Sequence, residues 1–119
     1  MSWNNRIQNP FTGWPEHRPA IIAEVGVNHG GDETLAWEMI LAAHESGADF
    51  VKLQSFITGE FFHPSLPYYQ STARLELSFE AQERLFAKAN ARGIRLMSTS
   101  FDPASADFID RFDPPAHKI

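Results

Sequence analysis

The sequence predicts an α/β fold in which parallel strands alternate with helices along the chain. Three observations lead to this prediction. Short apolar runs rich in β-branched residues recur, segments with apolar residues at helical spacing separate them, and glycine or proline stands at the junctions. A helix between two successive strands forms a right-handed parallel unit, so we expect four strands separated by three helices.

The first strand and the first helix lie between positions 20 and 47. The run 20–27 is apolar and leads into the glycine pair 30–31, as expected of a buried parallel strand that enters a helix. Asp32 is a suitable helix N-cap, and apolar residues follow it at helical spacing. Gly47 stands where a C′ glycine ends such a helix.

The second strand, 50–55, leads into a long connection. Positions 56–77 show no period, contain several Phe and Tyr residues, and are interrupted by Pro64 and Pro67. A connection of this length is usually functional or mobile. The aromatic residues at 61–69 could form a lid or a sugar platform, although packing or an oligomer contact is the more common role. Ser78 then caps a second helix that ends at Gly93.

The third strand, 94–100, precedes a helix that begins at Asp102-Pro103, since proline is favoured at the first helical position. We expect this helix to run to about Phe112 and to stop at the proline pair 114–115. Positions 116–119 then open a fourth strand with no helix after it. Because parallel strands need cover on both faces, we expect a truncated chain or another element at that edge.

Length and composition are ordinary for a soluble globular domain. A chain of 119 residues with 43% hydrophobic and 21% charged residues can bury a modest single core. The net charge of −5 argues against nucleic-acid or membrane binding, so local cations must hold any anionic ligand. The lack of cysteine, of a leader segment and of an apolar span favours the cytoplasm. We expect residues 1–18 to form an arm whose aromatic residues pack on the domain 19–119.

Glu24 is the first candidate for chemistry, because a carboxylate inside a strand needs a partner. Strand side chains alternate between faces, which places Glu24 and Lys52 on the same face of neighbouring strands, toward their carboxyl ends. Parallel α/β folds build their sites at those ends. The pair could also be a buried ion pair that only fixes the register of the strands.

Further polar residues fall at the carboxyl ends of predicted strands: Asn28, Gln54, Thr99 and Lys118. Such a set suggests a bound ligand, in which two lysines hold a phosphate and a carboxylate and the other groups supply oriented hydrogen bonds. His29 could contact that ligand or bond to the backbone of its own loop. The remaining histidines lack the spacing of metal ligands, and Gly30-Gly31 is not a phosphate-binding loop. Lys52 could instead form a Schiff base, as in class I aldolases.

Five segments in order resemble the N-acetylneuraminate (sialic acid) synthase family, which includes the legionaminic and pseudaminic acid synthases. These segments are IAEVGVNHGG (22–31), GADFVKLQSF (47–56), LSFE (77–80), STSFD (98–102) and AHKI (116–119). The resemblance covers about 19–119. It implies the first half of a (β/α)8 TIM barrel, with about four parallel strands and three helices, in a family whose barrel precedes a small antifreeze-like domain.

The resemblance also implies an activity, the condensation of phosphoenolpyruvate with an N-acetylated hexose such as N-acetylmannosamine, with release of phosphate. By position, Lys52 and Lys118 would bind phosphoenolpyruvate, Thr99 would contact its phosphate, and Gln54 would support that site. Glu24 would be the catalytic acid, base or orienting carboxylate. The family uses a divalent metal (Mn2+ or Mg2+), whose ligands we expect outside this chain, and full-length members suggest a homodimer.

This sequence departs from the family pattern at Ser100, where many members have proline, and at Leu53, where Phe is common. The Gly-Ser-Gly-Glu stretch and the metal-binding histidines expected after Ile119 are not in this sequence. We therefore expect the 119 residues alone to be inactive. Two alternatives stay open at this point: another phosphoenolpyruvate-dependent or Schiff-base barrel aldolase, and a non-catalytic α/β binding domain.

Overall fold

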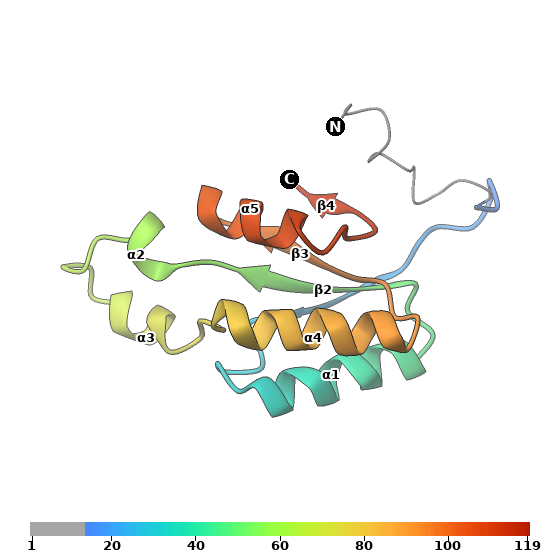
Figure 1. The fold of residues 1–119 in the computed structure, drawn as a ribbon, viewed down its shortest axis with the longest axis horizontal. Coiled ribbons are helices and arrows are strands. Elements are labelled where there is room, and N and C mark those ends of the chain that lie inside the picture. The colour runs from blue at the N-terminus through green and yellow to red at the C-terminus, as the bar shows by residue number, and fades with distance from the viewer. Residues whose placement is uncertain (1–13) are drawn as a thin grey trace.

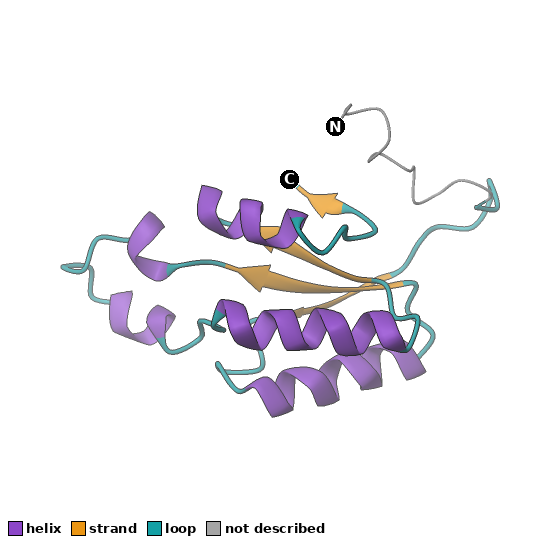
Figure 2. Ribbon diagram, in the orientation of Figure 1, coloured by secondary structure: helices purple, strands orange, loops and turns teal. Residues whose placement is uncertain are grey.

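The computed structural model describes residues 14–119, and its centre is one four-stranded sheet (Figure 1). The strands lie in the order β1-β2-β3-β4, every neighbouring pair is parallel, and helices separate them along the chain (Figure 2). The predicted α/β class is therefore confirmed. In chain order the elements are β1 (Ile22–Gly26), α1 (Glu33–Glu45), β2 (Phe50–Ser55), α2 (Thr58–Phe61), α3 (Tyr69–Ala73), α4 (Phe79–Ala91), β3 (Leu96–Ser100), α5 (Pro103–Asp110) and β4 (His117–Lys118).

The residues predicted to begin α1, α4 and α5 and to end α1 and α4 do so, whereas α5 ends at Asp110 instead of about Phe112. The side chains of Asp32, Ser78 and Asp102 accept hydrogen bonds from backbone N–H groups in the first turns of α1, α4 and α5. Gly47 and Gly93 follow α1 and α4 with φ of +93° and +68°, the left-handed conformation that glycine adopts most easily. β2 has the predicted bounds, whereas the other three strands are shorter than predicted: β1 begins at Ile22, β3 begins at Leu96, and β4 covers only His117–Lys118.

The segment 56–77 is not irregular throughout, as the sequence suggested, because it contains the two short helices α2 and α3. Helices of one turn carry no apolar period, so the pattern of the sequence could not reveal them. Tertiary contacts hold the segment. Glu76 accepts hydrogen bonds from the backbone N–H and the hydroxyl of Thr58, at 3.0 and 2.8 Å.

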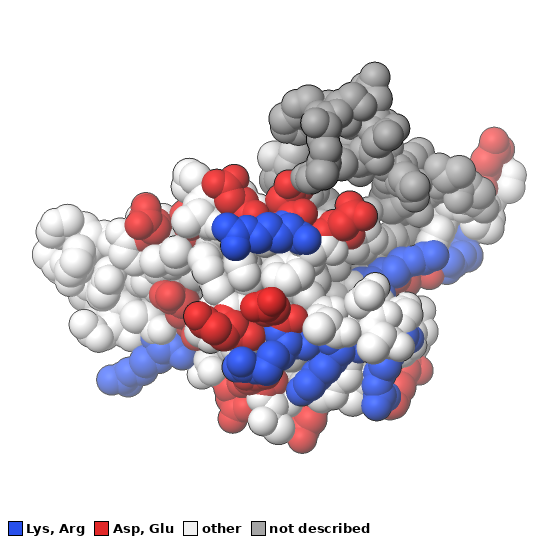
Figure 3. Space-filling model, in the orientation of Figure 1, with Lys and Arg blue, Asp and Glu red and all other residues white. Residues whose placement is uncertain are grey.

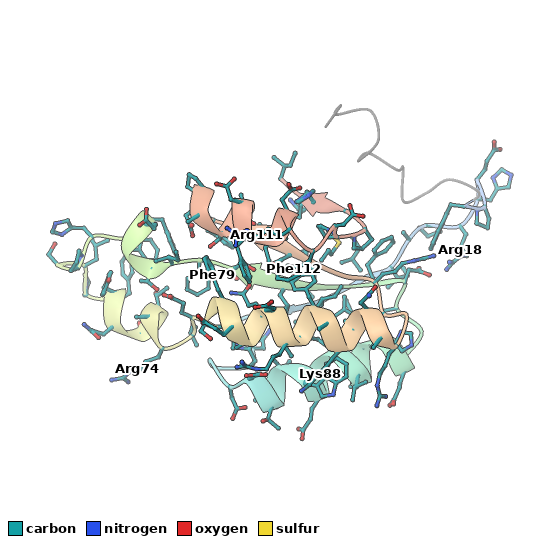
Figure 4. The ribbon with its side chains drawn as sticks, viewed as in Figure 1. Arg18, Arg74, Phe79, Lys88, Arg111 and Phe112 are labelled. Atoms are coloured by element: carbon teal, nitrogen blue, oxygen red, sulfur yellow. The ribbon has the colours of Figure 1, made fainter. Side chains whose placement is uncertain are left out.

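The loop between β1 and α1 packs directly on the end of this segment. Gly31 has φ of +82°, and a Cβ atom at this position would lie 2.2 Å from the carbonyl oxygen of Arg74. Only glycine allows such a close approach of two backbones. Arg74 itself is seen at the end of α3 in Figure 4.

Helices α1, α4 and α5 cover the same face of the sheet, and the hydrophobic core lies between these helices and the sheet. Aromatic rings join α4 to α5 and to the turn after it. Phe79 is stacked on Phe108 with ring centroids 4.1 Å apart, and Phe86 on Phe112 with centroids 5.0 Å apart. Phe79 and Phe112 are labelled in Figure 4. The strand residues that alternate with Glu24 and Lys52 belong to this core, which confirms the predicted faces. The core includes Val25, Val51, Leu53 and Leu96 from the strands and Ala36, Ile40, Leu85 and Ile109 from the helices.

Trp14 is the one aromatic residue of the predicted arm that the structure describes, and it packs on the sheet. Its ring lies 6.3 Å from that of Phe50, and its indole N–H donates to the carbonyl of Arg18 at 2.7 Å. Arg18 in turn forms a two-point ion pair with Asp49 (Figure 4). This pair, together with the N–H of Ile21, holds the pKa of Asp49 below its usual range. The rest of the arm, 1–13, lies outside the described residues.

Candidate functional site

The face of the sheet opposite the helices carries a pair of charged residues at its centre. Glu24 on β1 lies in register with Lys52 on β2, and Glu24 Oε2 is 2.6 Å from Lys52 Nζ. The Lys52 ammonium also donates to the hydroxyl of Thr99 on β3 at 2.7 Å. The Lys52 ammonium therefore joins three adjacent strands near their carboxyl ends. The alternation of side chains predicted that Glu24 and Lys52 share this face.

The two partners of this ion pair differ in exposure. The side chain of Lys52 is 11% exposed, whereas that of Glu24 is 44% exposed. The sequence suggested a buried carboxylate, and that expectation is wrong because none of the described helices covers this face of β1. An ammonium group that is nearly buried and already oriented by two oxygen atoms is suited to bind an anion, since little further ordering is needed.

A second polar row follows one step further along the strands. Gln54 on β2 lies in register with Thr99 on β3, and Thr99 with Lys118 on β4. The register thus brings three of the predicted residues side by side. The Lys118 side chain is exposed, however, and its ammonium donates to the carbonyl of Ile119 at 2.6 Å instead of to the residues of the row.

Gly26 is part of this arrangement, although the sequence did not single it out. The register of β1 against β2 shifts between Glu24 and Gly26, and Gly26 has φ of +58°. A Cβ atom on Gly26 would lie 2.9 Å from Glu24 Oε1 and 3.7 Å from Gln54 Nε2. The carboxylate therefore occupies the space left by the missing side chain. A glycine inside a strand is the signal that could have indicated this irregularity.

Asn28 and His29 belong to the loop that follows β1. The Asn28 amide donates to the carbonyl of Val25 at 3.0 Å. His29 is 1% exposed, and its Nδ1 accepts a hydrogen bond from the N–H of Gly31 at 2.9 Å. The proton of a neutral ring therefore resides on Nε2, which has no hydrogen-bond partner among the described residues. In this structure the Asn28 side chain bonds to the backbone of β1, and the His29 side chain bonds to the backbone of its own loop.

Burial lowers the pKa of His29, against smaller opposing effects from the Gly26 carbonyl and Asp32. The other histidines are not arranged as metal ligands. Within residues 14–119, no group of three His, Asp or Glu side chains could hold a metal ion. His63 bonds to Ser65, and His117 lies 3.5 Å from Asp110.

The surface of the described helices shows no broad anion-binding area in the view of Figure 3. On the face shown in Figure 3, acidic and basic side chains are interspersed over the helices. Arg84 on α4, for example, is paired with Glu33 on α1 at 2.8 Å. No helix within 14–119 is long and apolar enough to cross a membrane.

Comparison with known proteins gives a consistent result. Residues 39–119 match the model of the NeuB family. The N,N'-diacetyllegionaminic acid synthase of Legionella pneumophila is 44% identical over 103 residues, which cover 75% of this chain and 29% of that protein. A pseudaminic acid synthase of Campylobacter jejuni is 30% identical over 113 residues, covering 83% and 33%.

Solved structures agree with the sequence matches. The chain superimposes on the crystal structure of the N-acetylneuraminic acid (sialic acid) synthetase of Leptospira borgpetersenii, in complex with citrate, with a TM-score of 0.77 and 26% identity. This superposition covers 85% of the chain and 36% of that structure. The chain thus spans about a third of the length of these relatives.

Proposed function

Because this chain belongs to the NeuB family, we propose that it forms the phosphoenolpyruvate-binding part of a nonulosonic acid synthase. Its four parallel strands and their helices have the arrangement of the first half of a (β/α)8 barrel, as in the synthases that it resembles. The observation that carries the proposal is Lys52, held by Glu24 and Thr99 at the carboxyl ends of the strands. In such barrels the active site lies at that end.

The proposed ligand of Lys52 and of the second polar row is phosphoenolpyruvate, a small molecule with one phosphate and one carboxylate. Lys52 offers an ammonium that already donates to two oxygen atoms, and it can turn to an anion without a large loss of entropy. Thr99 would contact the phosphate and Gln54 would support the same site. Lys118, next to Thr99 in the register, would bind the second anionic group once its ammonium leaves the Ile119 carbonyl.

Glu24 is proposed as the acid or base near the reacting carbons. Its carboxylate lies in the open face of the sheet, in contact with the proposed cation. In this position the carboxylate can orient the attacking water and take up its proton, and the acid so formed can give a proton to the aldehyde oxygen of the hexose. The same contact argues against a Schiff base on Lys52, because an ammonium paired with a carboxylate is not a nucleophile.

The proposed reaction has three steps. The C3 carbon of phosphoenolpyruvate attacks the aldehyde carbon of the hexose, and the aldehyde oxygen takes up a proton. Water then adds to the cationic C2 carbon and loses a proton. The resulting tetrahedral intermediate expels phosphate, which leaves the new 2-keto acid. Lys52 stabilises the negative charges of phosphate and carboxylate throughout.

The divalent metal that the family resemblance implies remains a prediction. The described residues do not form a set that fits it, since Glu24 is paired with Lys52 and residues 14–119 contain no group of three His, Asp or Glu side chains that could hold a metal ion. We assign no step to the metal here and expect its ligands outside this chain. A homodimer and a location in the cytoplasm likewise remain proposals for the whole protein.

The test is phosphate release from phosphoenolpyruvate by the whole protein, with manganese and either N-acetylmannosamine or a 2,4-diacetamido hexose. Release that depends on both sugar and metal supports the proposal, and the preferred sugar identifies the branch of the family. If neither sugar supports release, but borohydride traps a carbonyl substrate on Lys52 or Lys118, the protein is a Schiff-base aldolase instead. We expect the 119 residues alone to release no phosphate.

A further inference from the structure

A chain of aromatic rings lies at the carboxyl ends of β2 and β3, directly beyond the row of Gln54 and Thr99. We refer to it as the aromatic cluster. The ring centroids of Phe56 and Phe101 are 6.2 Å apart, and Phe61 packs on both, at 5.6 and 5.9 Å. The members of the aromatic cluster are Phe56, Phe61, Phe62, Tyr68 and Phe101.

The backbone places Phe101 on the same face of the sheet as Thr99. The N–H of Phe101 donates to the carbonyl of Ser55 at 3.0 Å, so the ladder between β2 and β3 continues one residue past the end of β3. Strand side chains alternate, and Phe101 therefore follows Thr99 on its face, while Phe56 follows Gln54. The contact between the Phe56 and Phe101 rings agrees with this placement. Phe56 and Phe101 thus extend the proposed substrate face.

The rings of the aromatic cluster differ in how much of their surface is exposed. Phe56 is 5% exposed, whereas Phe101 is 45% exposed. Phe56 contacts the Phe101 ring in a T-shaped arrangement and Phe61 is stacked on it, so a partly exposed aromatic ring is held in place by packing. Because the ring is already ordered, a ligand that covers it loses little side-chain entropy of the protein.

We propose that Phe101 is the surface on which the acceptor hexose rests, with an acetamido methyl group and the apolar C–H groups of the sugar against the ring. This proposal rests on the proposed function and names the part of the site that selects the second substrate. The two substrates differ in chemistry. Phosphoenolpyruvate is anionic and matches Lys52, whereas the acetylated hexose is neutral and carries methyl groups that match an aromatic ring.

The spacing of the two surfaces suits a condensation. Two residues along a strand span about 7 Å, so the backbone positions of Thr99 and Phe101 lie roughly one sugar ring apart. A hexose that covers Phe101 would then lie next to a phosphate held at Thr99. Phe101 would contact the substrate without taking part in proton transfer.

The experiment compares Phe101→Leu with Tyr68→Leu in the whole protein. Tyr68 is the matched control, because it is 48% exposed and belongs to the aromatic cluster, but its ring contact is with Phe62 at the far end. We expect Phe101→Leu to raise the KM for the acetylated hexose about two- to ten-fold and to leave the KM for phosphoenolpyruvate unchanged. Phe101→Tyr, which keeps the ring, should restore the wild-type KM, and Tyr68→Leu should change neither value.

A second measurement does not depend on turnover. In saturation-transfer difference NMR with N-acetylmannosamine, the acetyl methyl protons should receive saturation from the wild type and lose it in Phe101→Leu. Mannose, which lacks the acetyl group, should show a weaker effect. If the wild type turns over but Phe101→Leu leaves the hexose KM unchanged, or raises both KM values equally, the proposal for Phe101 is wrong while the synthase function stands. If the wild type saturates the acetyl methyl group, Phe101→Leu loses this effect, and the wild type releases no phosphate, the sugar surface stands and the proposed function is wrong.

Discussion

Replacement of Gly26 by alanine tests whether the position of the Glu24 carboxylate depends on the missing side chain. At Gly26 a new Cβ atom would lie 2.9 Å from Glu24 Oε1, so the carboxylate has to move away. Gly30 provides the matched control. Its φ is +61°, close to the +58° of Gly26, but a Cβ atom there would have no neighbour within 4 Å.

Both substitutions place an L residue in the left-handed conformation, but only Gly26→Ala also displaces a carboxylate. A left-handed conformation costs an L residue about 1 to 2 kcal/mol, of which the stiffer unfolded chain offsets a part, so each variant should lose about 1 kcal/mol. Gly26→Ala should lose more, because displacement of the carboxylate weakens its bond to Lys52. Since Glu24 is 44% exposed and water screens the pair, we expect this additional loss to be at most about 1 kcal/mol.

Urea unfolding of the two variants at neutral pH measures the shared and the additional cost. Gly26→Ala should also lower kcat/KM of the whole protein, because it displaces the Glu24 carboxylate. Gly30→Ala should not, because it has the same backbone strain and leaves Glu24 in place. In the background of Glu24→Ala the two glycine variants should become equally stable. Equal stability and activity of the two variants in the wild-type background would refute the idea that Gly26 makes room for the carboxylate.

Three further predictions concern single side chains of the site. Lys52→Ala should weaken the binding of phosphoenolpyruvate by about 1.5 to 3 kcal/mol, and an unchanged KM for that substrate would contradict its role. Glu24→Gln should lower kcat more than substrate affinity, so turnover at the wild-type rate would exclude a proton transfer by Glu24. Burial lowers the pKa of His29 below its ordinary value of 6.5, which means that the unfolded chain binds the proton more readily. The stability that neutral His29 contributes is then complete above about pH 6.5 and is lost as the pH falls through the lowered pKa. Urea unfolding as a function of pH should show this loss, and His29→Asn, which keeps an acceptor for the N–H of Gly31, should reduce the slope.

Much of the fold could be predicted because each signal is local. Asp32, Ser78 and Asp102 cap their helices through contacts with residues three positions later, and Gly47 ends α1 through its own backbone freedom. The pairing of Glu24 with Lys52 followed from strand alternation and from the order of the strands.

The features that the sequence did not reveal depend on contacts between distant segments. The helices α2 and α3 are too short to leave a period, and their segment is closed by Glu76 and Thr58. The burial of His29 depends on how its loop packs. The direction of the Lys118 side chain, toward the carbonyl of Ile119, is a choice among rotamers that no pattern encodes.

The contact of Gly31 with the Arg74 carbonyl limits how the loops beside the candidate site can move and which insertions they can accept. Two loops that touch backbone to backbone, with no side chain between them, cannot shift independently. A displacement that begins at the end of α3 therefore reaches the Gly30-Gly31 turn, and through it the strand that carries Glu24. Insertions that alter substrate choice should accordingly be tolerated in the exposed part of 62–68, but not where the two backbones meet.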